Sequence, residues 1–162
     1  MKKFFAFVLC GAALLTLAAC AAKSGSGSQS GYAYVPNPFV DYETLKDAVK
    51  AAGFDFTVPD KVAGYSEKLV QLMSGKMLQV SFRNGDSRLT VRKQAGDEDI
   101  SGDYNEYSET EVVTVGDFEV TLRGNDGKVS NATWTAGGYS FAIVSDTPLE
   151  RSDMLDLIGQ IK

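Results

Sequence analysis

The chain has 162 residues, of which 16 are Lys or Arg, 21 are Asp or Glu and none is His, so its formal net charge at pH 7 is −5. This acidic balance argues against binding to nucleic acid or to an anionic lipid surface, since both need basic patches. The lack of His removes the usual general base near neutral pH, the commonest zinc ligand, and the Ser-His and Cys-His nucleophile pairs.

The N-terminal residues have the pattern of a secretory signal peptide. Lys2 and Lys3 precede an apolar run that ends at Ala19. That run is shorter than the roughly 20 residues of a permanent membrane helix, so we expect cleavage rather than a retained transmembrane anchor. The predicted signal peptide covers residues 1–19.

The segment Leu17-Ala18-Ala19-Cys20 resembles the lipobox of bacterial lipoproteins, in which the Cys is acylated and becomes the first residue after cleavage. The other cysteine, Cys10, lies in the part that is removed, so a mature chain offers Cys20 no disulfide partner. The resemblance implies attachment through palmitate or a related acyl chain on Cys20. It places the protein at the cell membrane, on the extracytoplasmic face.

Residues 20–38 are interpreted as a lipid-anchored flexible tether. Residues 24–31 are almost entirely Gly and Ser, a composition that behaves as a coil. Pro36 and Pro38 stiffen the end of the tether, because each ring fixes its own backbone and biases its predecessor toward extended geometry. We expect a single domain over residues 39–162.

The domain is predicted to begin with a helix over residues 41–53. Asp41 can cap its first turn and Gly53 can end it. Four apolar residues share one face of this helix, and they are Leu45, Ala48, Val49 and Ala52.

From Tyr65 onward, apolar and polar residues alternate with a period of two, which is typical of strands with one buried face. Turn signals such as Asn84-Gly85 and Gly137-Gly138 separate the runs. The clearest runs cover residues 78–83, 89–92, 118–123, 128–136 and 139–145. The pattern predicts about seven short strands joined mostly as hairpins.

A second helix is predicted at the C-terminus, where residues 147–150 have the pattern of a capping box with Pro148 in the first helical position. Its apolar stripe is expected to pack on the apolar face of the sheet. The predicted fold is therefore α+β, a curved antiparallel meander of about seven strands with an N-terminal and a C-terminal helix packed on it.

Several segments resemble uncharacterised extracytoplasmic domains of Gram-positive bacteria, which occur on lipoproteins and in proteins similar to anti-sigma factors. The segments are GFDFTVPDKVAGY (53–65), LTVRKQAGDEDISGDYN (89–105), VTLRG (120–124) and ATWTAGGYSFAIVSD (132–146), followed by the last helix. The resemblance covers about residues 41–162. Because its motifs are structural, it implies a compartment and a fold but no catalytic residue.

One acidic stretch has part of a calcium-loop pattern. Asp97, Asp99 and Ser101, followed by Gly, match the first half of such a loop, in which alternating oxygens converge on the cation. The twelfth position is Ser108 instead of a bidentate Glu, so an EF-hand is not expected. A strand-flanked calcium site that also uses Asp103 is one hypothesis, and an Asx-rich turn between strands is the other.

Arg83, Arg92 and Arg123 are expected on the polar face of the sheet, where they could bind an anionic glycan, carboxylate or phosphate. The alternative is a solvated face on which they pair with acids such as Glu119. The aromatic residues are expected mainly in the core, as cross-strand pairs, instead of lining a ligand cavity, and they are Trp134, Tyr139 and Phe141.

Three functions are compatible with these patterns. The preferred one is a non-catalytic domain that binds or senses an unknown extracytoplasmic protein or ligand, with no cofactor beyond the hypothetical calcium ion. The second is a carrier of a lipid or another apolar ligand in a cavity between sheet and helices. The third is a hydrolase that uses carboxylates alone. The tether, the missing catalytic residue types and the family resemblance favour the first, so we do not expect an enzyme.

Replacing Cys20 with Ser removes the thiol that acylation requires. We expect the Cys20→Ser protein to fold normally but to leave the membrane fraction, because the acyl chains supply the membrane affinity. Cell fractionation with immunoblotting measures this, and Cys10→Ser is the matched control that stays with the membrane. A Cys20→Ser protein that remains firmly in the membrane fraction contradicts the lipoprotein assignment.

Overall fold

The computed structural model describes residues 37–162. The predicted signal peptide, Cys20 and nearly all of the predicted tether lie outside the described residues. Within residues 37–162, neither helix combines the length and the apolarity needed to cross a membrane.

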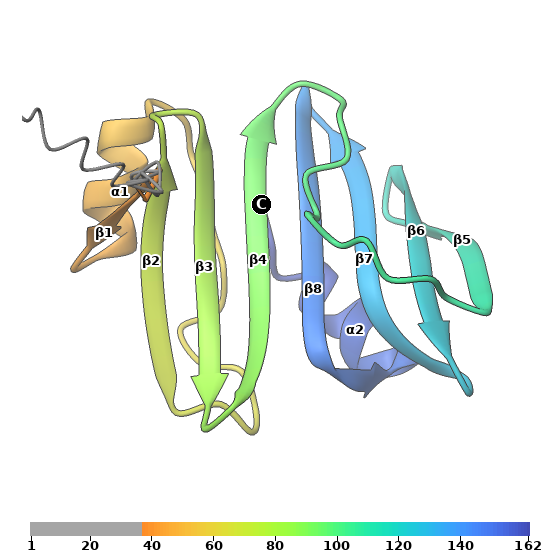
Figure 1. Ribbon diagram of the computed structural model, residues 1–162. Coiled ribbons are helices and arrows are strands. Elements are labelled where there is room, and N and C mark those ends of the chain that lie inside the picture. Colours follow the sequence, from red (N-terminus) through yellow and green to blue (C-terminus); the bar gives the residue numbers. More distant parts are fainter. Residues whose placement is uncertain (1–36) are drawn as a thin grey trace, which may run out of the picture. The chain divides into compact units, whose positions relative to one another are not determined.

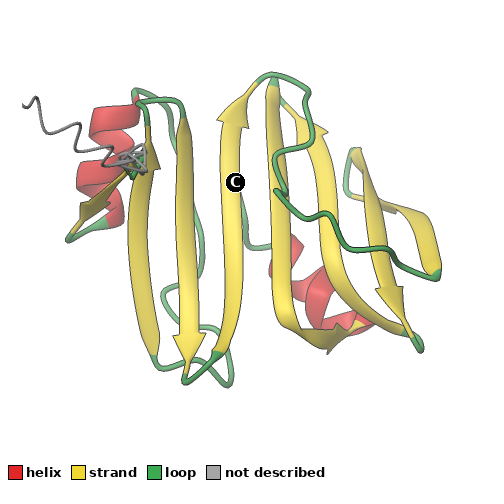
Figure 2. Ribbon diagram, in the orientation of Figure 1, coloured by secondary structure: helices red, strands yellow, loops and turns green. Residues whose placement is uncertain are grey.

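The described residues form one eight-stranded antiparallel sheet, open at both edges, and two short helices (Figures 1 and 2). The strands are β1 (Phe39–Tyr42), β2 (Glu67–Met73), β3 (Met77–Asn84), β4 (Ser87–Ala95), β5 (Glu109–Val115), β6 (Phe118–Asn125), β7 (Lys128–Ala136) and β8 (Tyr139–Glu150). The helices are α1 (Leu45–Ala52) and α2 (Arg151–Ile158). The α+β class and the antiparallel sheet predicted from the sequence are confirmed.

The strand order is β1-β2-β3-β4-β8-β7-β6-β5, so the sheet consists of two meanders joined along β4 and β8. The chain leaves β4 in the middle of the sheet and continues as residues 96–108, here called the crossing loop, to the far edge at β5. It then returns strand by strand to β8. Figure 1 shows the crossing loop on one face of the sheet and both helices on the other.

The helical side of the sheet is its apolar face. Alternate side chains of the central strands, such as Leu78, Val80 and Val91, are fully buried there beneath α1, α2 and the segment 53–66. Each buried side chain of this size contributes roughly 1.5–3 kcal/mol relative to exposure. Lys162 and Thr57 exchange two backbone hydrogen bonds of 2.8 and 3.1 Å, which tie the chain beyond α2 to that segment.

Aromatic rings cross the apolar face from β6 to β8. The Trp134 ring stacks on Phe141, with centroids 5.1 Å apart, and on Phe118 at 6.1 Å. Trp134 and Phe141 are each only 5% exposed, which confirms their predicted role in the core. These rings occupy the space between the sheet and the helices in which an apolar ligand would have to bind.

Lys93 continues this row on β4 and is only 7% exposed. Its Nζ lies 4.6 Å from the Tyr139 centroid and 5.0 Å from the Phe141 centroid, and it donates to the carbonyl oxygen of Asp55 at 2.6 Å. Burial lowers the pKa of Lys93, and the charge of Asp55 opposes that shift. Contacts with the faces of aromatic rings and with one carbonyl oxygen thus take the place of the water around the ammonium group.

The sequence prediction missed β1 and misplaced the start of α1. Asp41 lies in β1, opposite Gln71 of β2, and does not cap the helix. The cap is Thr44, whose Oγ1 accepts a hydrogen bond from the backbone N–H of Asp47 at 3.1 Å. A four-residue strand next to two prolines has too short a pattern to distinguish it from an extended lead-in.

The predicted capping box at the C-terminus is also wrong. Residues 147–150 extend β8, where Leu149 pairs with Val129, and α2 begins at Arg151 without a side-chain cap. The Thr147 hydroxyl lies 3.0 Å from the Ser87 hydroxyl of the neighbouring hairpin instead. Pairing with β7 therefore overrides a local helix signal.

Gly124 sits where the register of β6 and β7 shifts, and a Cβ at this position would overlap the carbonyl group of Lys128. We expect Gly124→Ala to lower the free energy of unfolding by about 3 kcal/mol, because the backbone must move to relieve the overlap. The control is Gly159→Ala, whose new methyl group meets only ordinary van der Waals contacts. Denaturation followed by fluorescence of the single Trp compares the two, and equal stability of both variants would refute the close approach.

Candidate functional site

The crossing loop and the strands beneath it form a cleft on the polar face. The crossing loop has to pass over β8, β7 and β6 to reach β5, and it covers these strands only in part (Figure 1). A cleft of about 360 Å³ lies between the crossing loop and strands β5 to β8. Its charged lining consists of Asp97, Glu98, Asp99, Glu119 and Arg123, and we call it the acidic cleft.

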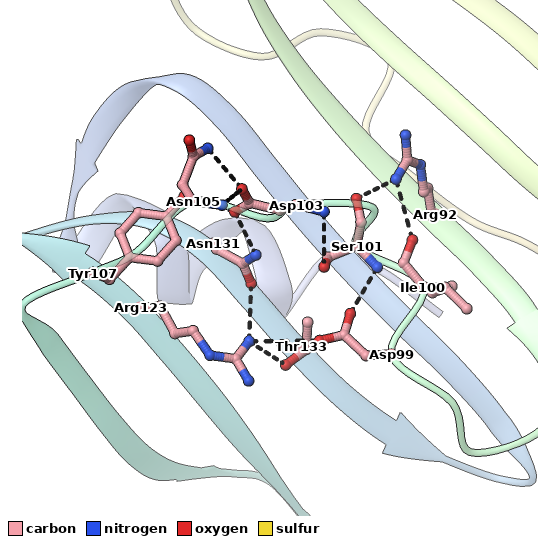
Figure 3. A network of polar contacts seen from close by, with 10 residues as sticks. All are labelled: Arg92, Asp99, Ile100, Ser101, Asp103, Asn105, Tyr107, Arg123, Asn131 and Thr133. Carbon is pink, nitrogen blue, oxygen red and sulfur yellow. Dashed lines mark hydrogen bonds and ion pairs between the residues drawn. The ribbon is translucent and has the colours of Figure 1, made fainter.

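Arg92 of β4 fixes the first half of the crossing loop (Figure 3). Its Nη1 donates to the carbonyl oxygens of Ile100, at 3.2 Å, and of Ser101, while its Nε donates to Gln79 at 2.7 Å. Burial, with a smaller contribution from Arg88, lowers the pKa of Arg92. An arginine nevertheless keeps its charge, so these remain charge-assisted hydrogen bonds.

Gly102 allows this approach, because a Cβ there would lie 2.7 Å from the Arg92 Nη1 and because its φ is +59°. In the calcium-loop hypothesis, the same glycine provides the sharp turn. The contacts of Arg92 explain the glycine differently, because a residue without a side chain leaves room for the guanidinium group.

Asp103 fixes the second half of the crossing loop. One of its carboxylate oxygens accepts from Tyr107 at 2.6 Å and from Asn131 of β7 at 2.7 Å. The other oxygen accepts from the backbone and side chain of Asn105, at 3.1 and 2.7 Å. Asn131 is only 2% exposed, so the loop is pinned to a buried position of the sheet.

These contacts shift the pKa values of both Asp103 and Tyr107. Burial alone would raise the pKa of Asp103, but hydrogen bonds from Asn131, Tyr107 and Asn105 outweigh it and hold that pKa below its usual range. Burial, together with the hydrogen bond to Asp103 and its negative charge, raises the pKa of Tyr107 to about 12. Asp103 is therefore a carboxylate, and Tyr107 a neutral donor, across the physiological pH range.

Arg123 of β6 connects the polar face to the wall of the acidic cleft. Its Nη1 lies 3.5 Å from the side-chain oxygen of Asn131 and 3.3 Å from the Thr133 hydroxyl. The same nitrogen is 3.8 Å from Asp99, whose other oxygen accepts from the backbone of Ser101 at 2.8 Å. Figure 3 shows how these contacts link the crossing loop to β6 and β7.

All four residues of the calcium hypothesis lie in the crossing loop, where Asp97 lines the acidic cleft and the side-chain oxygens of Asp99, Ser101 and Asp103 accept hydrogen bonds from protein donors. Asp99 and Asp103 each accept from backbone N–H groups two residues ahead, as in Asx turns. Among the residues from 37 onward, no cluster of three or more Asp, Glu, Cys or His side chains is arranged to hold a metal ion. Calcium binding stays a prediction.

The three arginines named from the sequence are not brought together. Arg92 and Arg123 both support the crossing loop, whereas Arg83 lines a separate depression of about 290 Å³ beside Arg88 and Asp146. The alternative prediction pairs these arginines with acids such as Glu119, and the acid that lies beside Arg123 is Asp99. Nothing in the sequence singles out Asn131 except its position on the polar side of the β7 alternation.

The acidic cleft has four carboxylates and one arginine, and that arginine already donates to protein oxygens. Its chemistry therefore suits a group that brings positive charge and hydrogen-bond donors. Comparison of the chain with protein-family models, with curated proteins and with solved structures gives no match. No relative therefore lends this chain a function.

Asp103→Asn replaces an acceptor of four hydrogen bonds with a side chain that presents its own N–H donors to Tyr107 and Asn131. We expect it to lower the free energy of unfolding at pH 7 by about 1–2 kcal/mol, with partial exposure limiting the loss. Because the folded-state pKa lies below the unfolded value of about 4, the difference between wild type and variant should shrink as pH falls below 4.

Thermal or urea unfolding across this pH range measures the effect. The control is Asp60→Asn, which changes a fully exposed carboxylate and should shift stability by less than about 0.5 kcal/mol. A pH-independent difference between wild type and Asp103→Asn would contradict the role of the charged form.

Proposed function

We propose that this chain is an extracytoplasmic lipoprotein, anchored through Cys20, whose domain binds a cationic ligand in the acidic cleft without catalysis. The sequence supports the anchor through its lipobox-like segment and its Gly/Ser tether. The observation that carries the binding function is the acidic cleft itself, where Asp97, Glu98, Asp99 and Glu119 face one already engaged arginine.

The rigidity of the cleft wall supports binding. Arg92 and Asp103 hold the crossing loop at two separate points, and Asp99 is held by the backbone of Ser101 and by Arg123, so this part of the cleft wall needs little ordering when a ligand arrives. Preorganisation of this kind reduces the entropic cost of association.

The alternatives have less support in the described residues. A carrier of an apolar ligand needs space between sheet and helices, where Trp134, Phe141 and their neighbours are stacked and buried. A carboxylate hydrolase would need a second group positioned to activate water, and no particular contact of the acidic cleft favours that role.

The double substitution Glu98→Gln with Glu119→Gln tests the acidic cleft. Both side chains are exposed, and neither takes part in an ion pair or side-chain hydrogen bond within residues 37–162. Tetralysine serves as the cationic probe and tetraglutamate as its anionic counterpart. We expect the double variant to bind tetralysine about fivefold more weakly, since each exposed charge contributes up to about 1 kcal/mol.

Isothermal titration calorimetry at low and at physiological ionic strength measures the affinity, which should fall with salt. The matched control, Glu43→Gln with Asp60→Asn, removes the same charge outside the cleft lining. Equal losses in both double variants, or a preference for tetraglutamate, would overturn the proposal.

A further inference from the structure

The edge of the sheet next to the acidic cleft is β5. Its single neighbour among the described strands is β6, so its other side presents N–H and C=O groups that pair with no described strand. β5 has seven residues, against four in the opposite edge strand, β1. It is therefore the longer of the two available edges.

The free edge is firmly held. Asn125 accepts from the backbone and hydroxyl of Ser108 at 2.8 and 2.9 Å, just before β5 begins. Further along, the Glu111 carboxylate forms a two-bond pair with Arg151 of α2, at 2.9 and 3.0 Å. A template strand fixed in this way does not have to be ordered by its partner.

The hairpin register shows which backbone groups point outward. Val115 pairs with Phe118 across the two-residue turn at Gly116-Asp117, and such flanking pairs exchange both hydrogen bonds. Alternation along the strand then directs the N–H groups of Thr110, Val112 and Thr114 away from β6.

Val112 lies where this edge meets the acidic cleft. Its side chain is 59% exposed, lines the cleft, and stands on the same face as its partner Thr121. An extended chain hydrogen-bonded to β5 would direct every second side chain toward this face. Those side chains would come close to the carboxylates of the cleft.

We propose that an extended segment of a cationic polypeptide adds to β5 as a further antiparallel or parallel strand, with alternate Lys or Arg side chains reaching the acidic cleft. Backbone hydrogen bonds supply the affinity and the cleft supplies the charge preference, as in other cases of strand addition. This inference rests on the proposed function, since the same carboxylates receive the basic side chains.

Charge also decides against a second copy of this chain as the occupant. The charged residues of β5 are Glu109 and Glu111, and it has no Lys, Arg or Pro. Because Val112 of β5 lines the acidic cleft, pairing two such edges would bring two acidic clefts close together, and their like charges would repel. A basic segment would instead be attracted to the carboxylates of the acidic cleft.

The test uses the synthetic peptide Ac-KTKVKTK-amide and its acidic counterpart Ac-ETEVETE-amide. Val112→Pro removes one outward N–H group and no hydrogen bond to β6, whereas Val112→Thr keeps that N–H group and serves as the matched control. We expect Val112→Pro to bind the basic peptide at least about tenfold more weakly than Val112→Thr and wild type. Fluorescence of Trp134 and the unfolding midpoint verify that each variant is folded.

Amide hydrogen exchange on the wild-type protein supplies a readout without substitution. The basic peptide should slow exchange at Thr110, Val112 and Thr114, and leave Val113 and Val115 nearly unchanged because they already bond to β6. Strand addition would be overturned if Val112→Pro bound the basic peptide as tightly as wild type and if these amides stayed unprotected. In that case, tetralysine binding that depends on Glu98 and Glu119 would still support the acidic cleft. Failure of every cationic probe would overturn both proposals, and concentration-dependent pairing of β5 with itself would overturn the choice of partner.

Discussion

The pairing of β4 with β8 is the constraint on which the remaining structure depends. It places the end of the first meander in the middle of the sheet, so the chain must cross one face to reach β5. The apolar face is occupied by helices and aromatic rings, and the crossing therefore takes place on the polar face. Backbone groups brought close to the sheet in this way need partners. Arg92 supplies them for the carbonyl groups of Ile100 and Ser101.

Because the crossing loop packs on the polar face, that face is partly buried and is not simply a solvated surface. Arg92, Arg123 and Asn131 of this face contact the crossing loop, and Asn131 is as deeply buried as many core residues. A network in which each member has a partner favours one geometry over its neighbours, whereas apolar packing alone tolerates small shifts. Asp99 consequently lines the cleft from a defined position beside Arg123, and Asp97, Glu98 and Glu119 complete the charged lining.

The sequence predicted what depends on local periodicity. Alternation placed Arg92 and Arg123 on the polar face and Trp134 in the core, and the contacts of these side chains agree. It missed what depends on strand order, because no local signal shows that β4 pairs with β8 or that Asp103 meets Asn131. The capping box at residues 147–150 failed for a related reason, since pairing with β7 outweighed a helix-start preference worth about 1 kcal/mol.

The pairing of β4 with β8, which forms the seam between the two meanders, also bears on the order in which the chain folds. Hairpins close short loops, so each meander can assemble from neighbouring residues, whereas the seam joins positions such as Leu89 and Ser145 that are distant in the chain. We therefore expect docking of the halves to be the slow step of folding. The contacts of Lys93 on β4 with the rings of Tyr139 and Phe141 on β8 can form only in that step. Until the halves dock, two further strand edges, those of β4 and β8, stay open to pairing with another chain, and this is the interval in which the chain is most exposed to aggregation.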